Sequence, residues 1–283
     1  MLGSLLGSWM ILFFLIAFLY SAVGHGGASG YLALMSFFLP YPELMKPIAL
    51  LLNLVVSGIA VVQFYRQGHF LWRVFVPIAL CSIPMAYLGG FTPLKDEWYQ
   101  MGLGVFLLVS VVLLNVDLRG RIALKKEENI PVFGVNSNAI AVEYKWAACL
   151  MGGGIGYVSG LLGIGGGILL SPVLLLLGWT QQKQTAALSA AFIFVNSTSG
   201  LFGSIQQHPL WESPVSLMDI TKNAAQLDVY WITVLMTVGT LILPVVLGGV
   251  IGSWYGAKKF SHRGMKAILS LVLLIAAIKL LLS

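Results

Sequence analysis

The chain has 283 residues, of which 58% are hydrophobic and only 9% are charged. Soluble domains carry about 25% charged residues, so this composition excludes a soluble globular protein and indicates an integral membrane protein. The net charge of +6 does not indicate a nucleic-acid partner, because the lysines and arginines lie in short loops between apolar segments, where they set membrane topology.

The first apolar segment is interrupted by glycines in the stretch SAVGHGGASGYLAL, residues 21–34. Glycine weakens a helix by about 1 kcal/mol relative to alanine, so consecutive glycines predict a break in the helix. The arm that follows has about 11 residues and would be roughly 16 Å long, which is half the thickness of the hydrocarbon core. Residues 5–39 are therefore predicted to form a re-entrant hairpin, which enters and leaves the membrane on one face.

Three transmembrane helices are predicted to complete the first repeat, residues 1–116, at 46–66, 73–91 and 98–116. The first of them carries KPIALLLNLVVSG with Asn53 near its centre, and the second carries IPMAYLGG, a proline followed by glycines. A polar linker follows at 117–145. Cys81 and Cys149 lie in apolar segments, and since two such cysteines make no disulfide framework, they are interpreted as small buried residues.

The second repeat, residues 146–283, presents the same features in the same order. We expect a hairpin at 146–178 around the stretch SGLLGIGGGILLS, followed by helices at 184–205, 231–254 and 266–282. The alignment pairs Gly24 with Gly163 and His25 with Ile164, and it pairs Asn53 with Asn196 in TAALSAAFIFVNSTSG.

The charges decide between parallel and inverted repeats. If each first element were one broken crossing, the two repeats would run parallel, and the basic residues after 116 and after 257 would lie on opposite sides of the membrane, against the positive-inside rule. If each first element is a hairpin, the repeats are inverted, and 12 of the 16 Lys and Arg residues fall on one side. The predicted fold is thus an all-α integral membrane protein of two inverted repeats, each one re-entrant hairpin plus three transmembrane helices. It would lie in the plasma (inner) membrane with the linker 117–145 cytoplasmic, and with the loop 206–229 and both termini outside.

The glycine breaks are the predicted binding site. A broken helix bares backbone N–H groups at a helix N-terminus, which favours an anion, and inverted repeats with discontinuous helices bind their substrates near the membrane midplane. Glycines at four-residue spacing are interpreted instead as helix packing surfaces, namely Gly152, Gly156 and Gly160, and Gly248, Gly252 and Gly256. The candidate substrate-binding residues are Gly24, His25, Gly26, Gly27, Asn53, Ser57, Gly163, Gly165, Gly166, Gly167, Asn196 and Thr198.

Two of these assignments stay open between function and structure. His25 either contacts the substrate or a proton, or forms a hydrogen bond to nearby backbone at the hairpin tip. Asn53 and Asn196, with the hydroxyl groups beside them, either bind the oxygens of an anion or join helices by hydrogen bonds.

The chain lacks the motifs of nucleotide-driven or metal-dependent chemistry. It contains no P-loop, no GxGxxG and no HExxH, so we expect no cofactor and no metal site, and no Asp or Glu lies within a predicted crossing. An anion leaving an inside-negative cell gains about 2.3 kcal/mol per charge per 100 mV, so export would need no coupling ion.

The two glycine clusters, the segment TAALSAAFIFVNSTSG and the ending LGGVIGSWYGAKK resemble the TauE/SafE family of sulfite and sulfonate exporters, over essentially the whole chain. The resemblance implies export of small sulfur-containing anions, and it transfers no residue roles. The main prediction is therefore a secondary transporter that exports a small oxyanion, not an enzyme. The partners would be the anion and the lipid bilayer, without nucleic acid, and the oligomeric state stays open, a homodimer included. The alternatives are a passive anion channel or an intramembrane enzyme with His25 as its base.

Overall fold

The structure is a computed structural model, and it describes residues 2–22, 24–38, 42–115, 145–206, 217–258 and 263–282. Every regular element within these ranges is an α-helix. Helices suit an apolar chain in lipid, because they satisfy all backbone hydrogen bonds within one segment. The predicted linker 117–145 lies outside the described residues except for Lys145, which begins a helix.

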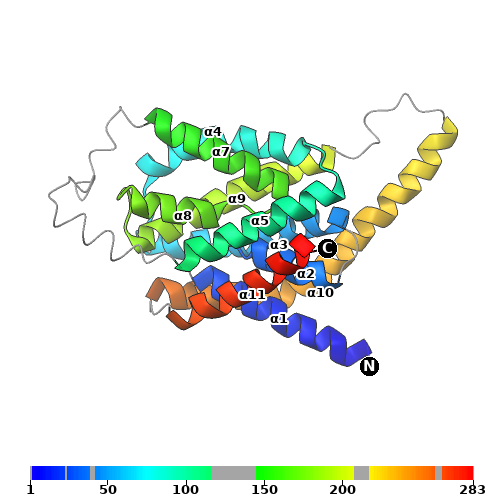
Figure 1. Ribbon diagram of the computed structural model, residues 1–283, viewed down its shortest axis with the longest axis horizontal. Coiled ribbons are helices and arrows are strands. Elements are labelled where there is room, and N and C mark those ends of the chain that lie inside the picture. The colour runs from blue at the N-terminus through cyan, green and yellow to red at the C-terminus, as the bar shows by residue number, and fades with distance from the viewer. Residues whose placement is uncertain are drawn as a thin grey trace.

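Each half of the chain contributes five helices to the described structure (Figure 1). Those of the first half are α1 (Leu2–Ala22), α2 (Ala28–Phe38), α3 (Pro42–Arg66), α4 (Trp72–Phe91) and α5 (Asp96–Asn115). Those of the second half are α7 (Lys145–Leu162), α8 (Gly167–Leu176), α9 (Gln182–Gln206), α10 (Leu217–Lys258) and α11 (Arg263–Leu282).

Five helices, α3, α4, α5, α9 and α10, are long and apolar enough to cross a membrane. In α11 the apolar stretch within the described residues is shorter, Leu273–Leu282. The helices after the two glycine breaks, α2 and α8, have 11 and 10 residues, which is about half the length that a crossing requires. Helix α10 begins at Leu217, well before the predicted start at 231, but the apolar span within it, Ile232–Gly256, matches the predicted 231–254.

The helices of the two halves pack in matching pairs. The pair α4 and α7 has its counterpart in α10 and α1, and the pair α4 and α9 has its counterpart in α10 and α3. Helices α3 and α9 contact each other, as do α5 and α11. In Figure 1 both marked termini lie on the right, whereas α5 ends and α7 begins on the left. Exchanging the two halves thus maps the helix contacts of one half onto those of the other.

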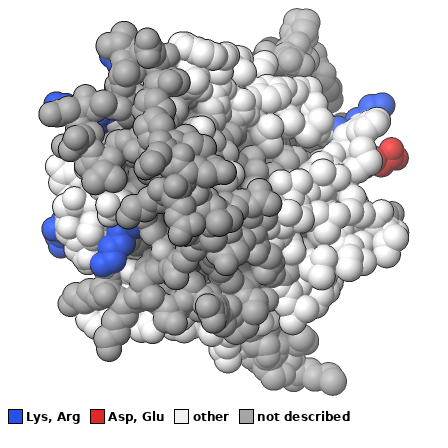
Figure 2. All heavy atoms as spheres, turned by 60° about the vertical axis from the view of Figure 1, so that its left-hand side comes forward, with Lys and Arg blue, Asp and Glu red and all other residues white. Residues whose placement is uncertain are grey.

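The described charged side chains lie mostly at helix ends. Exposed Arg66 and Arg73 flank the turn between α3 and α4, where burial and the nearby positive charge of Lys183 lower the pKa of His69. Since Lys183 is the second residue of α9, its effect on His69 places the turn close to the start of α9. In the view of Figure 2 the visible acidic atoms lie at the right edge of the molecule, and most of the visible Lys and Arg atoms lie on the left.

Two glycine stripes let neighbouring helices approach closely, as predicted for packing surfaces. A Cβ added to Gly152, Gly156 or Gly160 on α7 would meet a carbonyl oxygen of α4. On α10, a Cβ at Gly248, Gly252 or Gly256 would meet a carbonyl oxygen of α1. The packing interpretation of both stripes is confirmed. In the pair of α4 and α7 the stripe belongs to α7, and in the equivalent pair of α10 and α1 it belongs to α10, the counterpart of α4. The two pairs therefore make the same close contact, but the glycines come from helices that are not equivalent.

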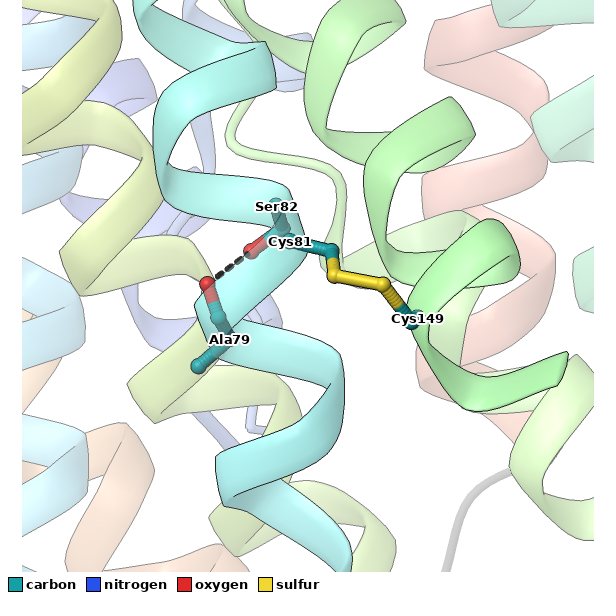
Figure 3. Close-up of a disulfide and its surroundings, with 4 residues drawn as sticks. All are labelled: Ala79, Cys81, Ser82 and Cys149. Carbon is teal, nitrogen blue, oxygen red and sulfur yellow. Dashed lines mark hydrogen bonds between the residues drawn. A yellow bond between two sulfur atoms is a disulfide. The ribbon is translucent and has the colours of Figure 1, made fainter. Parts of the chain in front are cut away.

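One expectation about this region was wrong. Cys81 on α4 and Cys149 on α7 form a disulfide, where the sequence suggested two separate small residues (Figure 3). The glycines of α7 explain the pairing, because they let the two backbones approach until the Cα atoms of the cysteines are 5.2 Å apart, within the range a disulfide requires.

The disulfide makes a direct chemical prediction. The chain has only two cysteines, so an alkylating reagent is expected to label none in the denatured, unreduced protein and both after reduction. Replacing both with serine is expected to lower stability by about 2–4 kcal/mol, since the bridge closes a long loop. Intact-mass spectrometry reads the first result and thermal unfolding in detergent the second. Two labelled cysteines without reductant would contradict the pairing.

Candidate functional site

The first glycine break begins where α1 ends. The N–H of His25 donates a 2.8 Å hydrogen bond to the carbonyl of Tyr20, and the N–H of Gly24 donates to Ser21 at 3.0 Å. This closure is a Schellman ending, which needs a residue in the left-handed conformation, and Gly24 supplies it with φ of +77°. The glycine cluster thus stops α1 inside the bundle and turns the chain toward α2.

The second break ends α7 with a closely related closure. The N–H groups of Gly163 and Ile164 both donate to the carbonyl of Ser159, at 2.9 and 3.1 Å, and Gly163 has φ of +74°. The two breaks are therefore equivalent, with Gly24 matching Gly163 and His25 matching Ile164, in agreement with the sequence alignment. A Schellman ending commonly carries an apolar residue at this last position. Ile164 fits that rule, whereas His25 places an imidazole there.

Asn53, in the middle of α3, joins the two breaks. Its Oδ1 accepts a hydrogen bond from the N–H of Ala28 at 3.3 Å, and its Nδ2 donates to Ser197 Oγ of α9 at 2.9 Å. A Cβ on either Gly26 or Gly165 would collide with the Asn53 amide. Asn53 is fully buried, and this single side chain bonds to the first break and to a helix of the other half while it packs against the second break.

The contacts correct the predicted pairing of Asn53 with Asn196. Around both Gly26 and Gly165 the nearest side chains include those of Asn53 and Ile193, so Ile193 takes the place in the second half that Asn53 takes in the first. Asn196 lies nearly one helical turn further along α9. The alignment matched amide with amide, whereas the packing of each helix against the glycines sets the true register.

His25 contacts the second half of the chain. Its Nε2 lies 3.2 Å from Ser171 Oγ on α8, and that hydroxyl lies 2.8 Å from Ser189 Oγ on α9. The ring also stands edge-on to Tyr20, with centroids 6.4 Å apart. The side chain is buried and reaches polar side chains of the other half, beyond the backbone at its own hairpin tip. Among the described residues it belongs to no cluster of His, Cys, Asp and Glu large enough to hold a metal.

Two predicted site residues use their hydroxyl groups within their own helices. Ser57 Oγ donates to the carbonyl of Leu54 at 3.3 Å, and Thr198 Oγ1 donates to that of Phe194 at 2.8 Å. Ser57 is buried, but Thr198 is only partly so. The structure therefore brings Ser197, which the sequence analysis did not select, to the breaks in place of Thr198.

Three buried polar side chains near the breaks have no hydrogen-bond partner in the part of the chain that the structure describes. They are Tyr31, Ser159 and Asn196. The Tyr31 hydroxyl lies beside Gly27, and the Cβ of Ser159 lies beside Gly166. A buried polar group without a partner costs about 1–3 kcal/mol, so these side chains mark places where a polar ligand or water would be stabilised.

Lys46 is a residue that the sequence analysis missed, because it was counted as a loop charge. It lies within α3, where its Nζ donates to the carbonyl of Gly90 on α4 at 3.1 Å. A Cβ on Gly163 would come within 2.8 Å of the Lys46 side chain, so the lysine packs on the second break. Its equivalent at the first break is Ala186, which packs on Gly24. The only sequence feature that could have indicated Lys46 is its position at the beginning of an apolar segment. Ordinary lysines at the membrane interface have the same position, so this feature does not distinguish them.

Comparison with known proteins gives consistent results. The family model described as "Sulfite exporter TauE/SafE" matches residues 9–280. The chain is 34% identical over 271 residues to "Probable membrane transporter protein y4hK" of Sinorhizobium fredii (strain NBRC 101917 / NGR234), with 96% of each chain covered. No solved structure gives a significant match.

Proposed function

The chain belongs to the sulfite exporter TauE/SafE family of membrane transporters, and we propose that it exports a small oxyanion, such as sulfite or an organosulfonate, by alternating access around the two glycine breaks. The relative named a probable membrane transporter supports transport, and the family's description supports a sulfur oxyanion. In this function the chain binds the anion and moves it across the membrane without catalysing a reaction.

The proposal includes an inverted topology in the plasma membrane, with hairpins 5–39 and 146–178 and the linker 117–145 in the cytoplasm. Three observations support it. The helix contacts exchange between the halves, α2 and α8 are too short to cross, and the two termini lie on the opposite side from the end of α5 in Figure 1. The clustering of basic residues on one side then agrees with the positive-inside rule.

The observation that carries the function is the meeting of both glycine breaks at Asn53. Non-helical backbone at membrane depth persists only where protein buries it or where it lines a polar cavity, and here it gathers polar groups from both halves of a pseudo-symmetric bundle. In transporters with inverted repeats, substrates bind at such a junction. A relative movement of the two halves would rearrange the contacts of Asn53 and His25 across it, and would expose the junction first to one side and then to the other.

Export of an anion is favoured by the membrane potential without a coupling ion, at about 2.3 kcal/mol per charge for each 100 mV. Purified protein in liposomes loaded with sulfite provides the test, with potassium gradients and valinomycin setting the potential. We expect efflux to be faster with the inside negative than with the inside positive. Sulfite efflux that ignores the potential would contradict uncoupled export of the charged anion.

The same liposomes separate the alternatives. Transport that is confined to cations or neutral solutes would exclude an oxyanion substrate. Unitary currents in planar bilayers would indicate a passive anion channel, because alternating access never opens both sides at once. Saturable sulfite flux without such currents is the result that the proposal expects.

A further inference from the structure

We propose that the oxyanion binds at the second glycine break, on the N-terminus of α8, and that the first break is closed by the protein's own Asn53. This inference rests on the proposed function, because it names the place where the transported anion is held. The two breaks then do not form a symmetric pair of sites: the second break holds the anion, and the first is occupied by a side chain of the protein.

The first break already has its acceptor. The N–H of Ala28, the first residue of α2, donates to Oδ1 of Asn53. An asparagine side chain that accepts a hydrogen bond from a helix N-terminus acts as a helix cap and satisfies one of the otherwise unbonded donors. In α2 the cap comes from another helix, α3, and it fills the place that an anion would occupy.

The second break has no such acceptor. Helix α8 begins at Gly167 after Gly166, and no side chain in the described ranges caps it. Its counterpart of Asn53 is Ile193, whose methyl groups cannot accept a hydrogen bond. Within the described residues, none of the N–H groups of residues 165–168 donates a hydrogen bond to the protein. The helix N-terminus therefore has one side-chain acceptor in the first half and none, among the described residues, in the second.

Two buried polar side chains belong to the helix surfaces that pack around this open helix end. Ser159 is 1% exposed, its hydroxyl has no partner within the described part of the chain, and its Cβ lies beside Gly166. On α9, Phe192 packs on Gly166 and Gly200 packs on Gly160, the neighbour of Ser159. Asn196 lies between them at four-residue spacing, so it shares the helix face that contacts this part of α7. It is fully buried, and neither polar atom of its amide has a hydrogen-bond partner among the described residues.

The chemistry of these groups selects the ligand. The open N–H groups carry the positive end of the α8 dipole, and the Ser159 hydroxyl and the Asn196 amide add hydrogen-bond donors. Lys46 packs its aliphatic stem on Gly163 at the start of the same break, and its charged Nζ lies beyond, at the carbonyl of Gly90. Several donors gathered around one helix end suit an anion with several acceptor oxygens, which is the chemistry of sulfite and sulfate.

Two substitutions test the site by opposite routes. Ser159→Ala removes one donor and leaves no protein group unpaired, so the fold should persist while sulfite affinity falls roughly tenfold or more. Ile193→Asn gives α8 the cap that Asn53 gives α2, so the introduced amide should compete with the anion and weaken binding at least as much. Sulfite and sulfate are the probes, and calorimetric titration of the purified protein in detergent is the measurement.

The control is Ser110→Ala, because Ser110 is equally buried but bonds to Phe106 within α5, away from both breaks. It should bind the probes as the unmodified protein does. If the unmodified protein binds neither oxyanion, the proposed export of sulfite is wrong. If it binds one and Ser159→Ala binds it equally well, the site is not at α8, whatever happens to the fold of Ile193→Asn.

Discussion

Replacing Gly165 with alanine is expected to abolish transport and to lower stability by about 2–5 kcal/mol. Gly165 has φ of +74°, a conformation that costs an L residue about 1–2 kcal/mol. The new Cβ would also collide with the Asn53 amide, which cannot move aside because it is bonded to Ala28 and Ser197. Overpacking of this kind costs about 1–3 kcal/mol more. Sulfite flux in liposomes and thermal unfolding in detergent measure the two effects.

Gly68→Ala is the matched control, since the two glycines share a backbone conformation but not an environment. Gly68 also has φ of +74°, and a Cβ there would meet nothing within 4 Å. This variant should lose only the conformational part, about 1–2 kcal/mol, and should retain transport. If Gly165→Ala behaved like Gly68→Ala in both measurements, the contact of the second break with Asn53 would not matter for function.

Replacing Lys46 with methionine is the second change with a large expected effect. Methionine keeps an unbranched apolar stem that packs on Gly163 but removes the positive charge and the donor to Gly90. Hydrogen bonds to a charged group contribute about 1.5–3 kcal/mol, so oxyanion flux should fall roughly tenfold or more. Loss of flux with an unchanged melting temperature would assign the lysine to the anion rather than to the fold.

Lys95→Met controls for the loss of a positive charge alone, because Lys95 is exposed at the start of α5. Its flux should match that of the unmodified protein, since an exposed charge is screened by salt. Equal flux through Lys46→Met and Lys95→Met would show that the charge of Lys46 plays no part in transport.

Much of the fold could be predicted because it depends on local chemistry. A glycine that adopts a positive φ ends a helix, and at both Gly24 and Gly163 the N–H of the next residue closes the helix on the carbonyl five residues before it. Glycines at four-residue spacing form a smooth face on any helix, and both predicted stripes pack on neighbouring backbones. The span predicted at 231–254 also matches the apolar part of α10, although the helix itself begins earlier.

The candidate site was predicted as a region and not in its internal arrangement. The glycines, His25 and Asn53 were selected, but Ser159 and Lys46 were not, because a serine beside a glycine and a lysine near a segment end are common in membrane helices. The pairing of Asn53 with Asn196 was wrong because the two halves were aligned by matching asparagine with asparagine. The equivalent positions of α3 and α9 are set by how each helix packs against the glycines. Two helices of different halves must pack before Ile193 can be recognised as the equivalent of Asn53.

The sequence by itself determined that the chain is an all-helical membrane protein built from two similar halves, each interrupted by glycines, because hydropathy and glycine content act over a few neighbouring residues. Only the tertiary structure decided that Cys81 meets Cys149, that Lys46 lies against the second break, and that Asn53 caps α2 while α8 stays open. Each of these depends on the close approach of helices far apart in the chain, and that approach is fixed by the packing of the whole bundle.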